Sequence, residues 1–238
     1  MIKKIKDLDI NYIQYGKGKD IVLLHGWGQN IQMMDPLGKN LSDNFKITIL
    51  DLPGFGSSEI PKFAYTINDY TELLHEFLEN LDIKNPILIG HSFGGRIAIN
   101  YSASYPVNKL VLFGSPFIVR EKKGLKVQIL KTLKKIKIFD NLAEVAKNHM
   151  GSEDYKAANG VMREILVQTV NTDLTSSARK IKAPTLLIWG ENDEAVPVSE
   201  AKLLEKNISD SALIVLPGTH YCYLENLGRV ISILEHFL

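Results

Sequence analysis

Apolar residues recur along this chain in two alternating patterns. Solid apolar runs of four to six residues indicate strands that are covered on both faces. Between the runs, apolar positions recur at three- and four-residue spacing, which is typical of helices that pack one face against a sheet. The runs that predict strands lie at 21–24, 47–50, 86–89, 109–113, 184–189 and 212–216. Helices are predicted around 33–41, 66–81, 199–207 and 225–237, and directly behind residue 94.

The strand and helix predictions alternate along most of the chain, which favours a mostly parallel sheet covered by helices on both faces. Residues 2–15 differ, because apolar and polar positions alternate there and predict an antiparallel pair at a sheet edge. Together these patterns predict an α/β fold with a doubly wound sheet of about eight strands.

One segment breaks the alternation. Residues 116–182 contain no convincing strand and are expected to be a helical insertion after the sixth strand. The core is then formed by 1–115 and 183–238. An insertion at the carboxyl end of a strand overhangs the side of the sheet where ligands bind, so we expect the insertion to be a lid.

Composition narrows the class of protein. The chain has 238 residues, 45% hydrophobic and 23% charged, with a net charge of +1, which favours neither nucleic acid nor a membrane as partner. The single cysteine, Cys222, excludes an internal disulfide framework and is expected to be a small buried side chain. Residues 1–7 are not followed by an apolar run, so we expect no signal peptide and a cytoplasmic protein. The stretch between Ser92 and Asp193 contains no metal-ligand spacing, and we expect neither a metal nor a cofactor.

A candidate nucleophile lies between a predicted strand and a predicted helix. Residues 90–94 read Gly-His-Ser-Phe-Gly and match the pattern G-x-S-x-G. In this context the pattern predicts a nucleophile elbow, a turn so tight that Ser92 has a strained, positive φ. Side chains at 90 and 94 would collide across such a turn, so glycine suits both positions.

A serine hydroxyl needs a base, and the base needs a group that orients it. His220 follows the last predicted strand and is the candidate base, while Asp193 lies in the turn after the preceding strand and is the candidate acid. Glu191 and Glu194 are alternatives for the acid, and Asp51 is a weaker one. His91, beside the serine, is expected to pack or hydrogen-bond locally, and His25 to shape its own loop.

The order serine, aspartate, histidine, each just after a strand, resembles the α/β-hydrolase family. Residues 25–28 (His-Gly-Trp-Gly) are similar to the oxyanion loop of that family, and 51–57 to its post-strand glycine loop. The resemblance covers essentially the whole chain and is weakest over the lid. It implies that Ser92 attacks an acyl carbon, that His220 transfers the proton, and that Asp193 orients the imidazole.

The same resemblance implies an oxyanion hole formed by the backbone N–H groups of Trp27 and Phe93, whose side chains would then shape the substrate pocket. The loop at 25–28 and the short lid also look like those of carrier-protein methyl ester esterases, monoacylglycerol lipases and small carboxylesterases. We therefore expect a small-molecule carboxylic ester or a thioester as substrate. Carbon–carbon bond hydrolases and acyltransferases with the same triad remain alternatives, as does a non-catalytic small-molecule sensor; the oligomeric state is left open.

The predicted lid carries an unusual run of charge. Residues 120–137 contain eight lysines and arginines and one acidic residue, Glu121. Apolar residues at near-helical spacing make this stretch a basic amphipathic helix, and Leu125, Ile129 and Leu133 are candidate substrate contacts. A solvated lid face whose apolar side covers the active site is the simpler interpretation. The alternative hypothesis is a docking patch for an acidic carrier, a coenzyme A thioester or an anionic lipid surface.

Overall fold

The structure, a computed structural model, describes residues 1–119 and 159–238. Eight strands form one sheet in the order β1-β2-β4-β3-β5-β6-β7-β8. Strands β1 and β2 are antiparallel, and β2 is antiparallel to β4, whereas all pairs from β4 to β8 are parallel. The predicted mostly parallel sheet of about eight strands, with an antiparallel pair at its edge, is therefore confirmed.

The strands lie where the apolar runs predicted them. They span β1 Ile2–Ile5, β2 Leu8–Gly16, β3 Lys19–Leu24, β4 Phe45–Leu50, β5 Ile87–His91, β6 Lys109–Phe113, β7 Thr185–Gly190 and β8 Ser211–Leu216. The central strand β5 is buried at all five positions. Such a strand is largely apolar because helices cover both of its faces.

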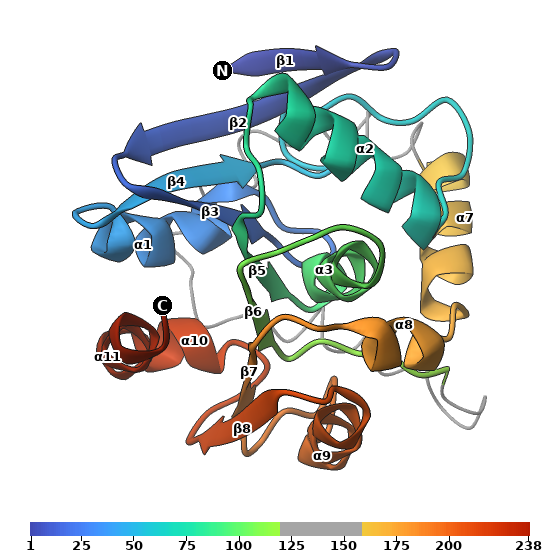
Figure 1. Ribbon diagram of the computed structural model, residues 1–238. Helices are drawn as coiled ribbons and strands as arrows, with labels where there is room; N and C mark the ends of the chain where they lie inside the picture. The colour runs from blue at the N-terminus through green and yellow to red at the C-terminus, as the bar shows by residue number, and fades with distance from the viewer. Residues whose placement is uncertain (120–158) are drawn as a thin grey trace.

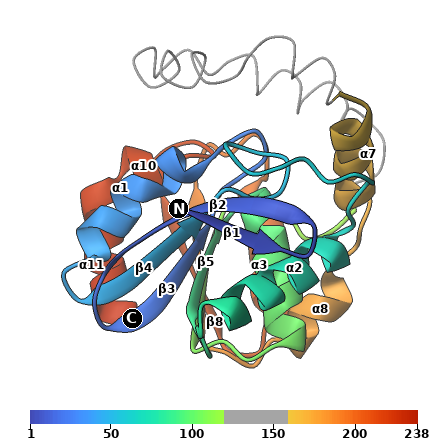
Figure 2. The same ribbon diagram turned by 90° about the horizontal axis from the view of Figure 1, so that it is seen from above.

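Helices pack on both faces of the sheet (Figures 1 and 2). One face is covered by α1 (Ile31–Leu41), α10 (Cys222–Glu225) and α11 (Leu227–Phe237), and the other by α2 (Ile67–Asn80), α3 (Phe93–Ser104), α8 (Thr175–Lys180) and α9 (Val198–Asn207). Helix α7 (Asn159–Val170) lies beyond the end of this second layer. The helix α2 begins with a capping box, in which Thr66 and Asp69 each satisfy a backbone N–H of the other.

The predicted lid, 116–182, is described only at its two ends. Residues 116–119 leave β6, and the chain is described again from α7 and α8, which are helical as expected of the insertion. The Leu174 N–H donates to the Phe117 carbonyl at 2.7 Å, so the two ends of the insertion lie side by side. The predicted basic helix, 120–137, lies outside the described residues, and the division into core and lid stays a prediction.

Candidate active site

Ser92 occupies a strained turn between β5 and α3. Its backbone has φ 51° and ψ −110°, a conformation that non-glycine residues seldom adopt. Its N–H donates to the Phe113 carbonyl at 2.9 Å, which ties the turn to the end of β6. The predicted strand, strained serine and helix are thus present in the expected order.

The glycines that flank Ser92 are required by close backbone approach. A Cβ at Gly90 would lie 2.7 Å from the Gly94 carbonyl oxygen, and a Cβ at Gly94 would lie 2.4 Å from the Leu24 carbonyl oxygen. Real Cβ atoms essentially never approach other atoms this closely, and backbone cannot move aside as a flexible side chain can. A side chain at Gly90 would therefore collide across the turn, as predicted, whereas one at Gly94 would collide with the backbone at the end of β3.

Asp193 and His220 form a buried hydrogen-bonded pair. His220 Nδ1 lies 2.8 Å from Asp193 Oδ2, and the two residues are 9% and 5% exposed. Because a carboxylate oxygen accepts, Nδ1 is the donor, and Nε2 is left free to take a proton. The other carboxylate oxygen, Oδ1, accepts the N–H groups of Ala195 at 2.9 Å and Val196 at 2.8 Å. Since Glu191 and Glu194 are exposed, the geometry favours Asp193 as the acid.

The strand ends place this pair at the same edge of the sheet as the serine. Strands β5, β6, β7 and β8 are neighbours in the sheet, and Ser92, Asp193 and His220 each follow one of them at the carboxyl end. The ring of His91, next to the serine, lies 4.7 Å from the ring of His220. Gly114, at the end of β6, lies beside the pair, because a Cβ there would be 2.9 Å from His220 Nδ1. The roles of the three residues stay predictions, and their placement suits those roles.

The sequence led us to expect that His91 packs or hydrogen-bonds locally. It does pack against neighbouring rings, but its hydrogen bond reaches a residue far along the chain. Its Nε2 lies 3.0 Å from the backbone carbonyl oxygen of His220, 129 positions along the chain. Burial lowers its pKa well below the usual range, and the nearby His220 and His25 rings act in the same direction. The neutral, fully buried ring of His91 therefore connects the end of β5, next to the candidate nucleophile, to the backbone of the candidate base.

The two predicted oxyanion donors lie in adjoining loops. Phe93 is the first residue of α3, so its N–H has no acceptor within the helix. The Gly94 N–H donates to the His25 carbonyl at 3.1 Å and so joins the turn at Ser92 to the loop that contains Trp27. The Trp27 and Phe93 rings pack edge to face at 5.2 Å between centroids. This arrangement is compatible with the predicted oxyanion hole, which itself stays a prediction.

His25 and Asp51 organise the loops around that position. His25 Nδ1 donates to the Gly26 carbonyl at 2.8 Å, and its Nε2 accepts the Leu52 N–H at 3.0 Å. Burial lowers the pKa of His25, in keeping with a neutral ring that donates at one nitrogen and accepts at the other. Asp51 accepts hydrogen bonds from the Ile31 N–H, the Ser57 N–H and the Asn11 side chain, each at 2.8 Å. Asp51 is therefore engaged in holding loops together.

An aromatic cluster lies directly beside the candidate nucleophile. Phe55 packs edge to face on Trp27 at 4.8 Å, and Tyr70 packs edge to face on Phe93 at 5.1 Å. Met162 of α7 packs on the loop that follows β4, since a Cβ at Gly54 in that loop would lie 2.4 Å from the Met162 sulfur. The residue that follows Ser92 is thus packed within an aromatic, apolar cluster. Leu125, Ile129 and Leu133, the lid residues expected to contact substrate, lie outside the described residues.

Arg96, which the sequence analysis did not single out, lies one turn into α3. Its N–H donates to the Ser92 carbonyl at 3.1 Å, and its guanidinium donates to the carbonyls of Pro116, at 3.1 Å, and Thr172. Burial lowers its pKa to about 10, which leaves it charged at neutral pH. Arg96 thus holds both ends of the insertion to the helix behind Ser92. This role of Arg96 is visible only in the tertiary structure, because Pro116 and Thr172 are 20 and 76 positions away from it in the sequence.

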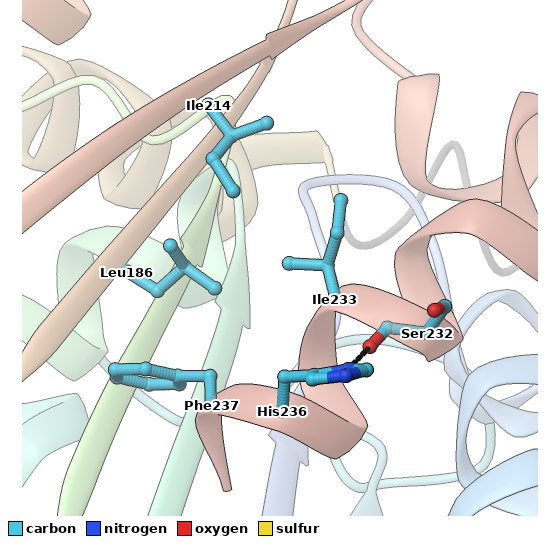
Figure 3. A pocket seen from close by; sticks show the side chains of 6 residues that line it. All are labelled: Leu186, Ile214, Ser232, Ile233, His236 and Phe237. Atoms are coloured by element: carbon cyan, nitrogen blue, oxygen red, sulfur yellow. Dashed lines mark hydrogen bonds between the residues drawn. The ribbon is translucent and has the colours of Figure 1, made fainter.

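Other features lie away from this site. A pocket of about 400 Å³ is lined by Leu186, Ile214, Ser232, Ile233, His236 and Phe237, between α11 and the last two strands (Figure 3).

Cys222 is buried, and burial raises the pKa of its thiol to about 12, as suits a packing residue. Within residues 1–119 and 159–238, no three histidine, cysteine or acidic side chains cluster as metal ligands would. No helix in those ranges has the length and apolar character needed to cross a membrane.

Comparisons with known proteins agree with this architecture. Residues 20–127 match the family described as alpha/beta hydrolase fold. The pimeloyl-(acyl-carrier protein) methyl ester esterase of Wigglesworthia glossinidia brevipalpis is 29% identical, over 92% of this chain and 93% of the relative. The 2-hydroxy-6-oxononadienedioate/2-hydroxy-6-oxononatrienedioate hydrolase 1 of Pseudomonas putida is 27% identical, over 88% of this chain and 84% of the relative.

Solved structures show the same fold. A meta-cleavage product hydrolase from Pseudomonas fluorescens IP01 superimposes with a TM-score of 0.85, at 21% identity, over 99% of this chain and 97% of that chain. The match extends through both the sheet and the helices on its two faces. By sequence and by structure, the chain is a protein of the α/β-hydrolase fold.

Proposed function

We propose that this protein is a serine hydrolase that cleaves a carboxylic ester, or a thioester, through an acyl-enzyme. The observation that carries the proposal is the buried pair of Asp193 and His220, joined at 2.8 Å, at the same edge of the sheet as the strained Ser92. Nucleophile, base and orienting acid are the three parts that acyl transfer through a serine requires.

In the first half of the reaction, the Ser92 hydroxyl oxygen attacks the acyl carbon while its proton passes to His220 Nε2. The carbonyl oxygen becomes an oxyanion, which accepts hydrogen bonds from the N–H groups of Phe93 and Trp27. In measured enzymes the loss of one such donor costs about 2.7–4 kcal/mol of transition-state stabilisation. When the intermediate collapses, the bond to the alcohol or thiol breaks, and His220 returns the proton to that leaving group.

In the second half, water replaces the alcohol. His220 takes a proton from water as the oxygen attacks the acyl carbon, and a second oxyanion forms in the same position. The bond to Ser92 then breaks, the serine oxygen recovers the proton from His220, and the carboxylic acid leaves. Asp193 keeps the imidazole in one tautomer throughout and stabilises the imidazolium that forms twice in each cycle.

The aromatic cluster indicates the kind of acyl group. The rings of Trp27, Phe55 and Phe93 pack on one another, and Phe93 directly follows Ser92 in the chain. Burial of a methylene group against such a surface contributes about 0.8 kcal/mol. The guanidinium of Arg96, close by in α3, already donates to two backbone carbonyls. We therefore infer a preference for an uncharged, apolar acyl chain.

Hydrolysis of a carbon–carbon bond, or transfer of the acyl group to another acceptor, by the same residues is an alternative; the relative from Pseudomonas putida is a hydrolase named for a substrate that is not described as an ester. A non-catalytic sensor that binds its ligand in the same pocket is the alternative from a different class. Cleavage of p-nitrophenyl esters with a kcat that rises as the acyl chain lengthens would favour the ester hydrolase. Ligand binding without turnover would favour the sensor.

The decisive experiment is labelling with a fluorophosphonate, followed by mass spectrometry of the modified peptide. Native protein should be labelled at Ser92, and both Ser92→Ala and His220→Ala should abolish labelling. The Cys222→Ser variant is a control that should be labelled like the native protein. Absence of labelling, with the protein folded by circular dichroism, would refute the proposal.

A carrier-borne or membrane-borne ester is a finer form of the proposal. It rests on the basic stretch 120–137 and on the carrier-protein esterase among the relatives. Substitution of Lys131, Lys134 and Lys135 by glutamate should lower activity on an acyl-carrier-protein ester, or on an ester in anionic vesicles, and spare a neutral soluble ester. An equal effect on all of these substrates would rule out the docking role.

A further inference from the structure

The residue before the candidate nucleophile is a histidine that the proposed chemistry does not use. His91 ends β5 and is fully buried. Its ring packs against those of Tyr221 and Tyr223 at 5.4 and 4.9 Å, and against that of His220 at 4.7 Å. These three neighbours belong to the loop and short helix that follow β8, so the ring lies under the segment that carries the candidate base.

The ring makes one strong polar contact with that segment. The His220 carbonyl oxygen can only accept, so His91 Nε2 is the donor of the 3.0 Å hydrogen bond between them. The opposite nitrogen, Nδ1, lies 3.3 Å from Gln29 Oε1, which already accepts the Gly26 N–H at 3.0 Å. Both contacts would be hydrogen bonds only if the ring carried two protons.

Burial decides between the two contacts. It lowers the pKa of His91 well below the usual range, so the ring carries a single proton at neutral pH. The shorter contact, to the His220 carbonyl, retains that proton. Nδ1 then has no proton to donate to Gln29 Oε1, so that contact is not a hydrogen bond, and the Gln29 side chain instead donates from Nε2 to the Tyr221 hydroxyl at 3.4 Å.

We propose that His91 is a positioning residue that holds the backbone of the catalytic base. His220 is held at two points, its ring by Asp193 and its main chain by His91. Since His91 and Ser92 are consecutive, the bond fixes the base to the same rigid strand end that carries the nucleophile. The direction of His220 Nε2 relative to the Ser92 hydroxyl is thereby set without contact between His91 and substrate. This inference rests on the proposed function.

Two substitutions separate positioning from packing. His91→Leu fills the space but removes the donor, whereas His91→Gln keeps an N–H donor near the place of Nε2. We expect His91→Leu to lower kcat on a p-nitrophenyl ester about 10²-fold with KM unchanged, because small displacements of a catalytic group have effects of this size. We expect His91→Gln to recover most of the loss.

Hydrogen exchange supplies a readout that does not depend on activity. The peptide that spans residues 217–224 should exchange faster in His91→Leu than in native protein, and at a near-native rate in His91→Gln. Ile10→Ala is the control for general destabilisation, because Ile10 is fully buried on β2, outside the site. That variant should lose thermal stability but keep its kcat at temperatures where it is folded.

Three results would overturn the proposal: native kcat in His91→Leu, equal losses in His91→Leu and His91→Gln, or unchanged exchange of 217–224 in His91→Leu. Failure of the proposed function gives a different result. The native protein would then neither react with the fluorophosphonate nor cleave esters, while the exchange rates of the variants would still show whether His91 holds the loop.

Discussion

The loops after β4 and β7 each contain a buried aspartate, and the two aspartates have different partners. Asp51 and Asp193 are 3% and 5% exposed, and each accepts two backbone N–H groups. Asp51 also accepts a hydrogen bond from the side chain of Asn11, whereas the second oxygen of Asp193 accepts one from His220. Burial and bonds to backbone N–H groups therefore do not distinguish the two aspartates, and the histidine partner is what favours Asp193 as the acid.

Removal of the charge at Asp193 should have the largest effect. Asp193→Asn can still accept the N–H groups of Ala195 and Val196, but it no longer holds His220 in the tautomer that leaves Nε2 free. We expect kcat to fall about 10⁴-fold, as for the same change in a serine protease triad, with little change in stability. Steady-state kinetics beside thermal unfolding would test both parts, and a large loss of stability would contradict the comparison.

The corresponding change after β4 should affect folding instead. Asp51→Ala leaves three donors without their acceptor, two of them backbone N–H groups. We expect the free energy of unfolding to fall by about 3 kcal/mol, and kcat to fall far less than in Asp193→Asn. Urea unfolding monitored by tryptophan fluorescence measures the first quantity. If Asp51→Ala remained as stable as the native protein, the structural role of this loop would be wrong.

A methyl group at Gly114 should disturb the Asp193–His220 pair although neither residue is itself substituted. The position has φ +50°, and a Cβ there would lie 2.9 Å from His220 Nδ1 and 3.1 Å from Asp193 Oδ2. We expect Gly114→Ala to lower kcat about 10²-fold through displacement of the imidazole. Gly228→Ala is the matched control, because nothing lies within 4 Å of a Cβ at that helical position. Native activity in Gly114→Ala would show that the pair adjusts without cost.

The smallest effect is expected at the two glutamates beside Asp193. Glu191 and Glu194 are exposed, and the backbone of the loop directs Asp193 inward. The double variant Glu191→Gln, Glu194→Gln should change kcat less than about twofold, in line with surface substitutions that leave buried contacts intact. A loss comparable to that of Asp193→Asn would move the acid to one of them.

Much of this fold follows from local pattern. The strand predicted at 109–113 has the same bounds in the structure, because five residues covered on both faces must be almost entirely apolar. The turn at Ser92 was also predictable, because few sequences other than glycine, serine and glycine between a strand and a helix can adopt it. In each case the physical cause lies within a few residues of the signal.

The contacts that connect distant segments were not predictable in the same way. The bond from His91 to the His220 carbonyl and those from Arg96 to both ends of the insertion depend on which strands become neighbours. A buried arginine or histidine has no sequence signature that names its acceptor, least of all when the acceptor is a backbone carbonyl. Asp51 is the same case, since its three donors come from three separate segments.

The backbone of Ser92 has a consequence for the selection of this sequence. A non-glycine residue in so rare a conformation costs of order 1–3 kcal/mol, a substantial part of the margin by which proteins remain folded. Glycine at position 92 would relieve the strain, so selection for stability alone would remove the serine. Its presence at that position records a compromise in which a less stable chain was retained for what its hydroxyl can do.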